Sequence, residues 1–238
     1  MILAELFKQL SYGQLSNLSL SGNGSGVIVG EQKPKIISMA NEALLKIYSR
    51  FILNEKTLVL ALTNGTLRYS LTRANAIYGA DVSNPNGYII DTEENPFLGD
   101  VVRVLAAHDS FGVDVALNDD QANISVFTPA PEAVQIRQSA NNIRAISGLM
   151  LTYQAKHPEL DVDGDDEQLI ELPDVLEPAL KAYVSYMVFS GMNGPENSAK
   201  AAEHMSQYEA TCLEIIDKDL VSSSYSRTNT RFNRNGWA

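Results

Sequence analysis

The feature that most constrains this chain is the stretch from Leu172 to Leu220, which has the pattern of two helices separated by a short break. Leu172-Pro173 precedes the first helix, and Pro178 falls within its first turn, where a missing N–H is tolerated. One face of this helix is expected to carry residues at three- and four-residue spacing: Val175, Ala179, Tyr183, Tyr186, Met187 and Ser190.

The second helix of this stretch is expected to follow a break at Gly191, Gly194 and Pro195. Ser198 is a candidate for its N-cap because a hydroxyl oxygen can accept the first free N–H groups. Its apolar side is predicted to hold Ala199, Ala202, Met205, Cys212, Ile215 and Ile216. Two amphipathic helices joined by a short Gly/Pro break predict an antiparallel helical hairpin.

The N-terminal part of the chain also has helical patterns. Ile2–Gln9 is expected to form a short amphipathic helix, and residues 34–51 a longer one that packs on the predicted hairpin. The Gly-rich segment 21–30 lies between them. A phosphate-binding loop would need a following Lys-Ser/Thr and a preceding strand, so a surface connection is favoured.

From Lys56 the pattern of apolar residues changes from helical to alternating. Segments 57–62 and 66–71 flank Asn64-Gly65, a dipeptide that favours a tight β-hairpin. Further strands are predicted at residues 101–106, 112–117, 123–127 and 133–137. Residues 149–155 fit a strand or a short helix. Six or seven short strands predict a small antiparallel sandwich or barrel.

These elements together predict an α+β fold. A helical bundle would combine the N-terminal helices (1–53) with the C-terminal helical hairpin (156–220). An antiparallel β sandwich or barrel (54–155) would be inserted between them, and an extended C-terminal arm (221–238) would follow. The chain of 238 residues, 45% hydrophobic and 20% charged, has the composition of an ordinary globular protein.

Candidate catalytic and metal-binding residues are sparse. The three histidines, His108, His157 and His204, are far apart, and the single cysteine, Cys212, is expected to be a buried thiol with no disulfide partner in the chain. The acidic run 161–167 alternates aspartates as calcium loops do. Its glycine and twelfth position do not fit an EF-hand, so a solvated acidic turn is favoured and calcium binding is left open. We therefore expect no enzyme activity, no cofactor and no resident metal.

The segment after Leu220 combines basic and aromatic residues without any acidic one. These types dominate binding hot spots, whereas linkers avoid aromatics. The candidate docking residues are Tyr225, Arg227, Arg231, Phe232, Arg234 and Trp237. A partner protein or a neighbouring copy is the expected target. An arm that stacks on single-stranded nucleic acid is a weaker alternative, because the net charge of −11 opposes phosphate binding.

The order of these pieces resembles a known protein family. The residues that carry the likeness are KPKIISMANEALLKIYSRF, LMLTYQAKHPEL, IELPDVLEPALKAYVSYMVFSGM and ENSAKAAEHMSQYEATCLEI, followed by the polar arm. The most telling piece is the Leu-Pro that opens a helix with an AL-x-x-Y-V run. The chain resembles the head-to-tail adaptors of tailed bacteriophages, especially the tail tubular protein A type of short-tailed phages.

The resemblance implies a structural protein of the virion neck that is assembled in the host cytoplasm and has no membrane as a partner. It implies a ring, usually of twelve copies, that joins the portal to the tail nozzle and lets the genome DNA pass without specific binding. The portal-docking role falls on residues 225–237. The ring number, the identity of both partners and the state before assembly are left open. The alternative is a ligand-binding β module on a helical scaffold, with a glycan as one example of the ligand and Tyr69 and Tyr88 as the clearest aromatics.

Overall fold

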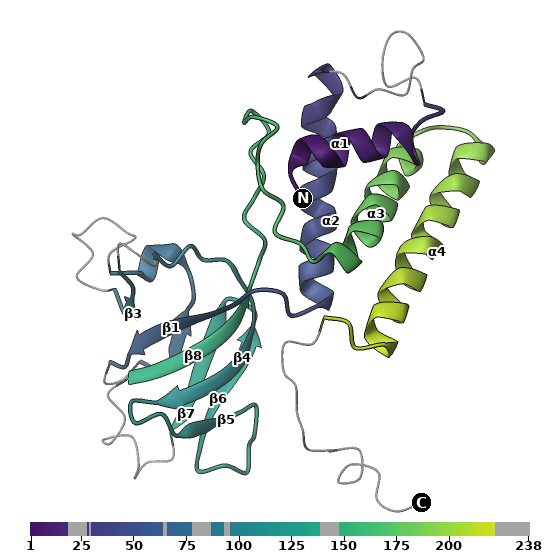
Figure 1. Ribbon diagram of the computed structural model, residues 1–238. Helices are drawn as coiled ribbons and strands as arrows, with labels where there is room; N and C mark the ends of the chain where they lie inside the picture. The colour runs from purple at the N-terminus through teal and green to yellow at the C-terminus, as the bar shows by residue number, and fades with distance from the viewer. Residues whose placement is uncertain are drawn as a thin grey trace, which may run out of the picture. The chain divides into compact units, whose positions relative to one another are not determined.

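The fold is α+β, as the sequence predicts, with four α-helices and an eight-stranded sheet among the described residues (Figure 1). The computed structural model describes residues 1–18, 28, 30–63, 66–77, 87–92, 96–138 and 148–221. The chain forms two compact units. One contains residues 1–44 and the described residues from Glu159 onward, and the other contains residues 45–158.

The four α-helices are α1 (Leu3–Tyr12), α2 (Lys33–Arg50), α3 (Glu177–Ser190) and α4 (Pro195–Asp217), with short 3-10 turns at Gly30–Gln32, Arg73–Asn75 and Asp174–Leu176. α1 begins one residue later than expected, and Glu5 Oε2 accepts the N–H of Ile2 at 3.1 Å, which is one of the two hydrogen bonds of a capping box. Its apolar residues Leu3, Leu6, Phe7 and Leu10 are buried. The predicted helix 34–51 is confirmed as α2.

α3 and α4 lie side by side and run in opposite directions (Figure 1). The rings of Tyr183 and Tyr208 meet edge to face at 5.0 Å, and Phe189 stacks on His204 at 5.3 Å. Of the face predicted for the first helix, Ala179 and Tyr183 are buried, but α3 is buried on most sides and not on a single apolar face. Its buried residues are Ala179, Leu180, Ala182, Tyr183, Val184, Ser185, Val188 and Phe189. Val175, outside the helix, is 40% exposed.

α4 begins at Pro195, so the prediction of Ser198 as N-cap is wrong. Gly194 occupies the N-cap with a φ of +111°, which a residue with a side chain rarely adopts, and Pro195 supplies a helical φ at the next position. The buried side of α4 consists of Ala201, Tyr208, Cys212 and Ile215. Of the predicted apolar side, Cys212 and Ile215 are therefore correct.

The strands are β1 (Glu55–Ala61), β2 (Arg68–Ser70), β3 (Ile89–Ile90), β4 (Val101–Asp109), β5 (Asp114–Leu117), β6 (Ile124–Ala130), β7 (Ala133–Gln138) and β8 (Gly148–Ala155). They form one sheet in the order β2-β7-β6-β5-β4-β8-β1-β3. All neighbours are antiparallel except β5 and β6. Since the strands belong to one curled sheet, the predicted sandwich of two sheets is not confirmed. The segment 149–155 is a strand.

The predicted hairpin between β1 and β2 is wrong. β1 pairs with β8 and β3, and β2 pairs with β7, while Asn64-Gly65 lies outside the described residues. The pairing of β1 with β8 aligns buried leucines, Leu58 with Leu151 and Leu60 with Leu149. This apolar match between distant segments outweighs a local turn preference, because cross-strand packing sets sheet stability.

The two edges of the sheet approach each other through a tyrosine that precedes β3. The hydroxyl of Tyr88 accepts the N–H of Ser70 in β2 at 2.8 Å and donates to its carbonyl at 2.9 Å. The ring of Tyr88 meets the buried ring of Tyr69 edge to face at 5.1 Å. The Tyr88 side chain therefore ties the β3 edge to the β2 edge and satisfies backbone groups that an edge strand would leave free.

Candidate functional site

The predicted docking residues of the C-terminal arm, Tyr225 to Trp237, lie outside the described residues. Their role stays a prediction. The described chain ends at Val221, so the structure shows the root of this arm, which is the end of α4.

α4 ends in a capped turn that fixes how the chain leaves the helix. The N–H of Leu220 donates to the carbonyl of Ile215 at 3.1 Å, and that of Asp219 donates to Ile216 at 3.2 Å. Asp219 has a left-handed φ of +50°. This is the Schellman pattern, normally completed by glycine, and here an aspartate takes the left-handed position.

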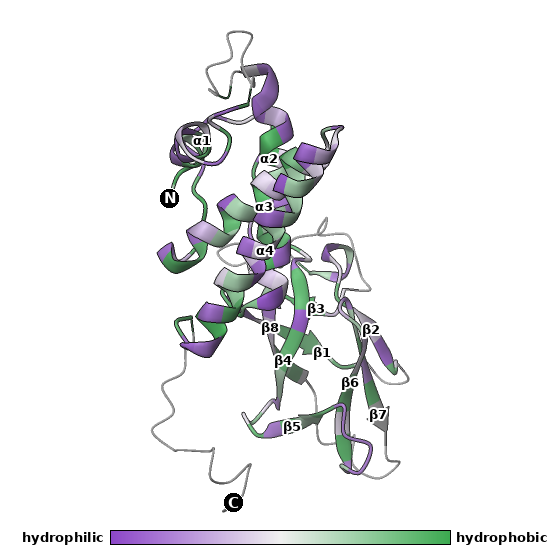
Figure 2. Ribbon diagram, turned by 90° about the vertical axis from the view of Figure 1, so that its right-hand side faces the viewer, coloured by the Kyte–Doolittle hydropathy of each residue, from purple (hydrophilic) through white to green (hydrophobic). Residues whose placement is uncertain are grey.

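An exposed apolar stripe lies at the end of α4. Leu213 is 53% exposed, and Ile216 and Leu220 are each 50% exposed. We call these three residues the root stripe. Leu213 and Ile216 are three residues apart, so they lie along one side of α4, and this side borders the buried side that contains Cys212 and Ile215. Figure 2 shows the mixture of hydrophobic and hydrophilic positions along α4.

Sequence reasoning placed Ile216 on the buried side and gave no role to Leu213 or Leu220. The signal that would have found the stripe is an excess of apolar residues over what one buried helix face can hold. Lys218 and Glu214 form an ion pair one turn apart beside it, and the hydrogen bond and charge of Lys218 lower the pKa of Glu214. A charged rim around apolar anchors is the usual arrangement at a protein interface.

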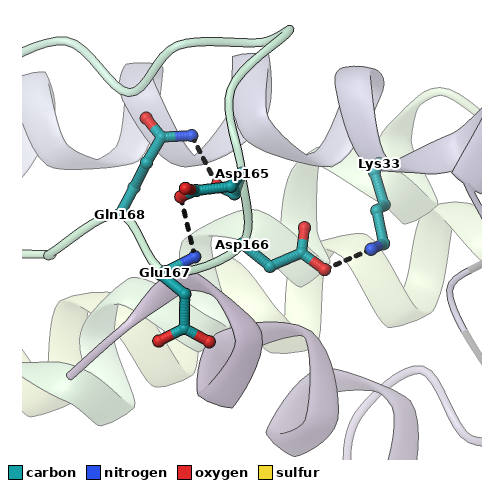
Figure 3. A network of polar contacts seen from close by, with 5 residues as sticks. All are labelled: Lys33, Asp165, Asp166, Glu167 and Gln168. Atoms are coloured by element: carbon teal, nitrogen blue, oxygen red, sulfur yellow. Dashed lines mark hydrogen bonds and ion pairs between the residues drawn. The ribbon is translucent and has the colours of Figure 1, made fainter.

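The acidic run 161–167 is a turn held by its own side chains. Asp161 Oδ1 accepts the N–H of Asp163 at 3.0 Å, and Asp165 Oδ1 accepts the N–H of Glu167 at 3.1 Å. Gln168 Nε2 donates to the carbonyl of Asp161 at 2.8 Å. It also donates to the carbonyl of Asp165 at 2.9 Å (Figure 3). The alternating aspartates thus act as turn caps. Within the described ranges, no three His, Cys, Asp or Glu residues are arranged to hold a metal ion.

The same loop holds the start of α1. Asp166 pairs with Lys33 at the start of α2 (Figure 3), and its carbonyl accepts the N–H of Ala4 at 2.8 Å. The carbonyl of Gln168 accepts the N–H of Leu3 at 3.0 Å. These bonds satisfy N–H groups in the first turn of α1, which have no partner within the helix. The loop therefore has a structural role in the helical unit.

The three histidines lie in different surroundings. His108 Nε2 is 3.1 Å from Asp114 Oδ1 in the neighbouring strand, and His157 meets the ring of Tyr48 edge to face at 5.4 Å. His204 stacks on Phe189, and Cys212 is buried two helical turns further along α4. The described histidines therefore do not share a site.

A comparison with protein-family models decides the kind of protein. The model described as SU10 adaptor protein matches residues 22–231, which include α2, the whole sheet, α3 and α4. The chain belongs to the SU10 adaptor protein family. This confirms the predicted phage head-to-tail adaptor, whereas the short-tailed-phage subtype stays a prediction.

The SU10 adaptor family is a family of structural phage proteins and not of enzymes. No curated protein matches this sequence significantly. Among the helices that the structure describes, none is long and apolar enough to cross a membrane. Membership of an adaptor family implies contacts with the portal and tail components of a phage.

Proposed function

We propose that this SU10 adaptor is a structural protein of the virion neck whose copies assemble into a ring between the portal and the tail nozzle. The ring, usually of twelve copies in adaptors that this chain resembles, would enclose the channel for DNA. The observation that carries this proposal is the family match over residues 22–231.

In this proposal the parts of the chain have separate tasks. The helical segments 1–53 and 156–220, a bundle with a C-terminal hairpin, make most ring contacts. The β segment 54–155 meets tail components, and the arm 221–238 docks on the portal. The root stripe supports the last assignment, because it provides half-exposed apolar side chains directly before the arm. Apolar and aromatic anchors are the residues that hot spots use.

The charge of the chain is consistent with a DNA channel. A net charge of −11 gives the ring a surface that repels phosphates, so DNA can slide without being held. A ring whose lumen is lined by lysine and arginine would contradict this part of the proposal.

The folded structure argues against the glycan-binding alternative, because the two tyrosines expected to contact a sugar have other roles. Tyr69 is 1% exposed, and the Tyr88 hydroxyl is bonded to the backbone of Ser70. The Tyr69 ring is therefore closed to a sugar, and the Tyr88 side chain is already engaged by the Tyr69 ring and by Ser70. The alternative is therefore set below the adaptor function.

The decisive experiment is to mix the purified chain with the portal ring of its own phage and image the complexes by electron microscopy. The full chain is compared with a chain that ends at Val221. A second ring stacked on the portal only with the full chain supports both the adaptor role and the arm. Stacking by both chains keeps the adaptor role and moves docking to the helices, and stacking by neither contradicts the proposal.

A finer test replaces the two large aromatic residues of the arm. The double variant Phe232→Ala/Trp237→Ala is expected to weaken portal binding at least tenfold, as loss of hot-spot anchors does. Its thermal midpoint should equal that of the parent, because the arm is expected to contribute no core. Asn229→Ala/Asn233→Ala is the matched control in the same segment, and equal losses in both variants would argue against aromatic anchoring.

A further inference from the structure

The turn between β4 and β5 presents a fixed apolar projection. Asp109 Oδ1 accepts the N–H groups of Phe111 and Val113 at 2.8 and 2.9 Å, and Gly112 has a left-handed φ of +79°. Phe111 is 80% exposed and Val113 is 61% exposed. We call these two side chains the knob. An aromatic ring held on a rigid turn loses little conformational freedom when it docks.

A hollow of about 470 Å³ lies at the other end of β5. It is lined by Asn118, Asp120, Phe127, Thr128, Pro129 and Gln135. Asn118, at a left-handed φ of +53°, holds its wall in place. Its Oδ1 accepts the N–H of Thr128 at 2.9 Å, and its Nδ2 donates to Thr128 Oγ1 at 2.9 Å. The hollow is therefore formed before any ligand enters it, with Phe127 and Pro129 as its apolar parts.

The knob of one chain is too far from the hollow of the same chain to fill it. β5 (Asp114–Leu117) separates them, and the path from Gly112 to Asn118 along extended backbone is about 20 Å at roughly 3.3 Å per residue. A phenylalanine side chain does not span this distance. A contact between the two features must therefore join different copies.

We propose that the knob of one copy inserts into the hollow of the next copy. The contact joins two different surfaces, so it is heterologous and continues from copy to copy until a ring closes. The inference rests on the proposed ring and adds a contact within the β unit to those assigned to the helices. The occupant of the hollow is Phe111, whose ring would meet Phe127 and Pro129.

The charges near both features predict how this contact responds to salt. Asp114 beside the knob is 93% exposed at its side chain, and Asp120 lines the hollow. Carboxylates on both sides oppose an apolar contact, and salt screens that repulsion. Association is therefore expected to strengthen as ionic strength rises from about 0.01 to 0.15 M, where an interface held by salt bridges would weaken.

Disulfide trapping tests the contact directly. Cys212 is buried, so a chain with Val113→Cys, which keeps the Phe111 ring, and a chain with Gln135→Cys each carry one reactive thiol. Oxidation of the mixed chains, alone and on the portal, is expected to give a disulfide dimer. Neither variant alone should do so. Lys46→Cys, an exposed position on α2, replaces Gln135→Cys as the control.

Quantitative binding gives the second test. Phe111→Ala is expected to raise the dissociation constant between copies at least tenfold, whereas Leu98→Ala, half-exposed in the same unit, leaves it unchanged. Rings that form without the mixed disulfide would overturn the inference but not the proposed function. A disulfide dimer formed by Val113→Cys alone would also overturn it. So would a Phe111→Ala chain that loses portal or nozzle binding while the contact between its copies is unchanged. If no ring forms alone or on the portal, both fail.

Discussion

Tyr88→Phe removes one oxygen atom from the place where the edges of the sheet meet. The variant keeps the ring and its edge-to-face contact with Tyr69 at 5.1 Å. It loses the two hydrogen bonds that the hydroxyl makes with the N–H and carbonyl of Ser70, at 2.8 and 2.9 Å. The change therefore isolates the tie between β3 and β2 from the packing of the aromatic pair.

The expected cost follows from the surroundings of Ser70. A hydrogen bond contributes about 0.5–1.5 kcal/mol net, and a buried group left without a partner costs more. Ser70 is exposed, so water can replace the hydroxyl at both backbone groups. The two bonds together should contribute about 1–1.5 kcal/mol, at the lower end for two bonds. The thermal midpoint of the β unit should fall by roughly 3–6 °C.

Urea unfolding measures the loss of stability, and hydrogen exchange locates it. Faster exchange is expected at the amide of Ser70. Tyr12→Phe, the same chemical change at a residue that is 75% exposed, is the control and should cost nearly nothing. An unchanged unfolding free energy and unchanged exchange at Ser70 in Tyr88→Phe would show that the sheet edges do not depend on this hydroxyl.

Three further predictions concern buried groups and the acidic loop. Gln154→Leu should cost about 2–4 kcal/mol in urea unfolding, because the buried Gln154 amide donates to the carbonyls of Tyr48 and Phe51 and accepts from Arg103 Nε at 2.8 Å. Burial raises the pKa of Tyr88, Tyr153 and Tyr183, with the Asp100 carboxylate adding to the rise for Tyr153. The folded state thus holds these protons more tightly than the unfolded state does. The contribution of the three tyrosines to the free energy of unfolding is therefore complete below about pH 10 and is lost as the pH rises further. A series of unfolding curves at different pH values will detect the loss. Lys33→Met should cost at most about 1 kcal/mol, and less in high salt, because its pair with Asp166 is about one-third exposed on each side.

The positions of most elements were predictable because they depend on local patterns. Alternating residues located β4, β6 and β7, and the wide apolar stripe located α2. The pairing of strands was not predictable in the same way. β1 pairs with β8, which is some ninety residues away in the sequence, because buried leucines on the two strands pack together. No local sequence signal identifies that partner.

The exposed surfaces were the least predictable part of the site. A helical pattern identifies apolar residues but does not say which will be covered, so Ile216 and Ile215 look alike in the sequence and differ in the fold. The knob had a visible signal in Asp109-Ser110-Phe111-Gly112, a turn sequence with an aromatic residue at its apex. Recognising it as exposed required knowing that β4 pairs with β5.

Substitution of Gly112 changes the backbone of the knob and leaves the side chains that make the contact in place. Its φ of +79° disfavours any residue with a side chain, yet an added Cβ would meet no atom within 4 Å. Gly112→Ala therefore introduces backbone strain without a clash, at a cost of about 1–2 kcal/mol. At Gly99, also at positive φ, an added Cβ would lie 3.3 Å from the backbone nitrogen of Arg73. A substitution there would therefore combine backbone strain with steric crowding.

Gly112→Asn is the matched variant, because asparagine tolerates the left-handed conformation better than alanine. If the knob docks as a preformed projection, Gly112→Ala should weaken the association between copies although Phe111 and Val113 are intact, and Gly112→Asn should recover most of the loss. Analytical ultracentrifugation of the parent chain, Gly112→Ala and Gly112→Asn measures the strength of association of each and so tests this order. Equal association in all three would mean that the turn adapts during docking, and rigidity would then have no part in the contact.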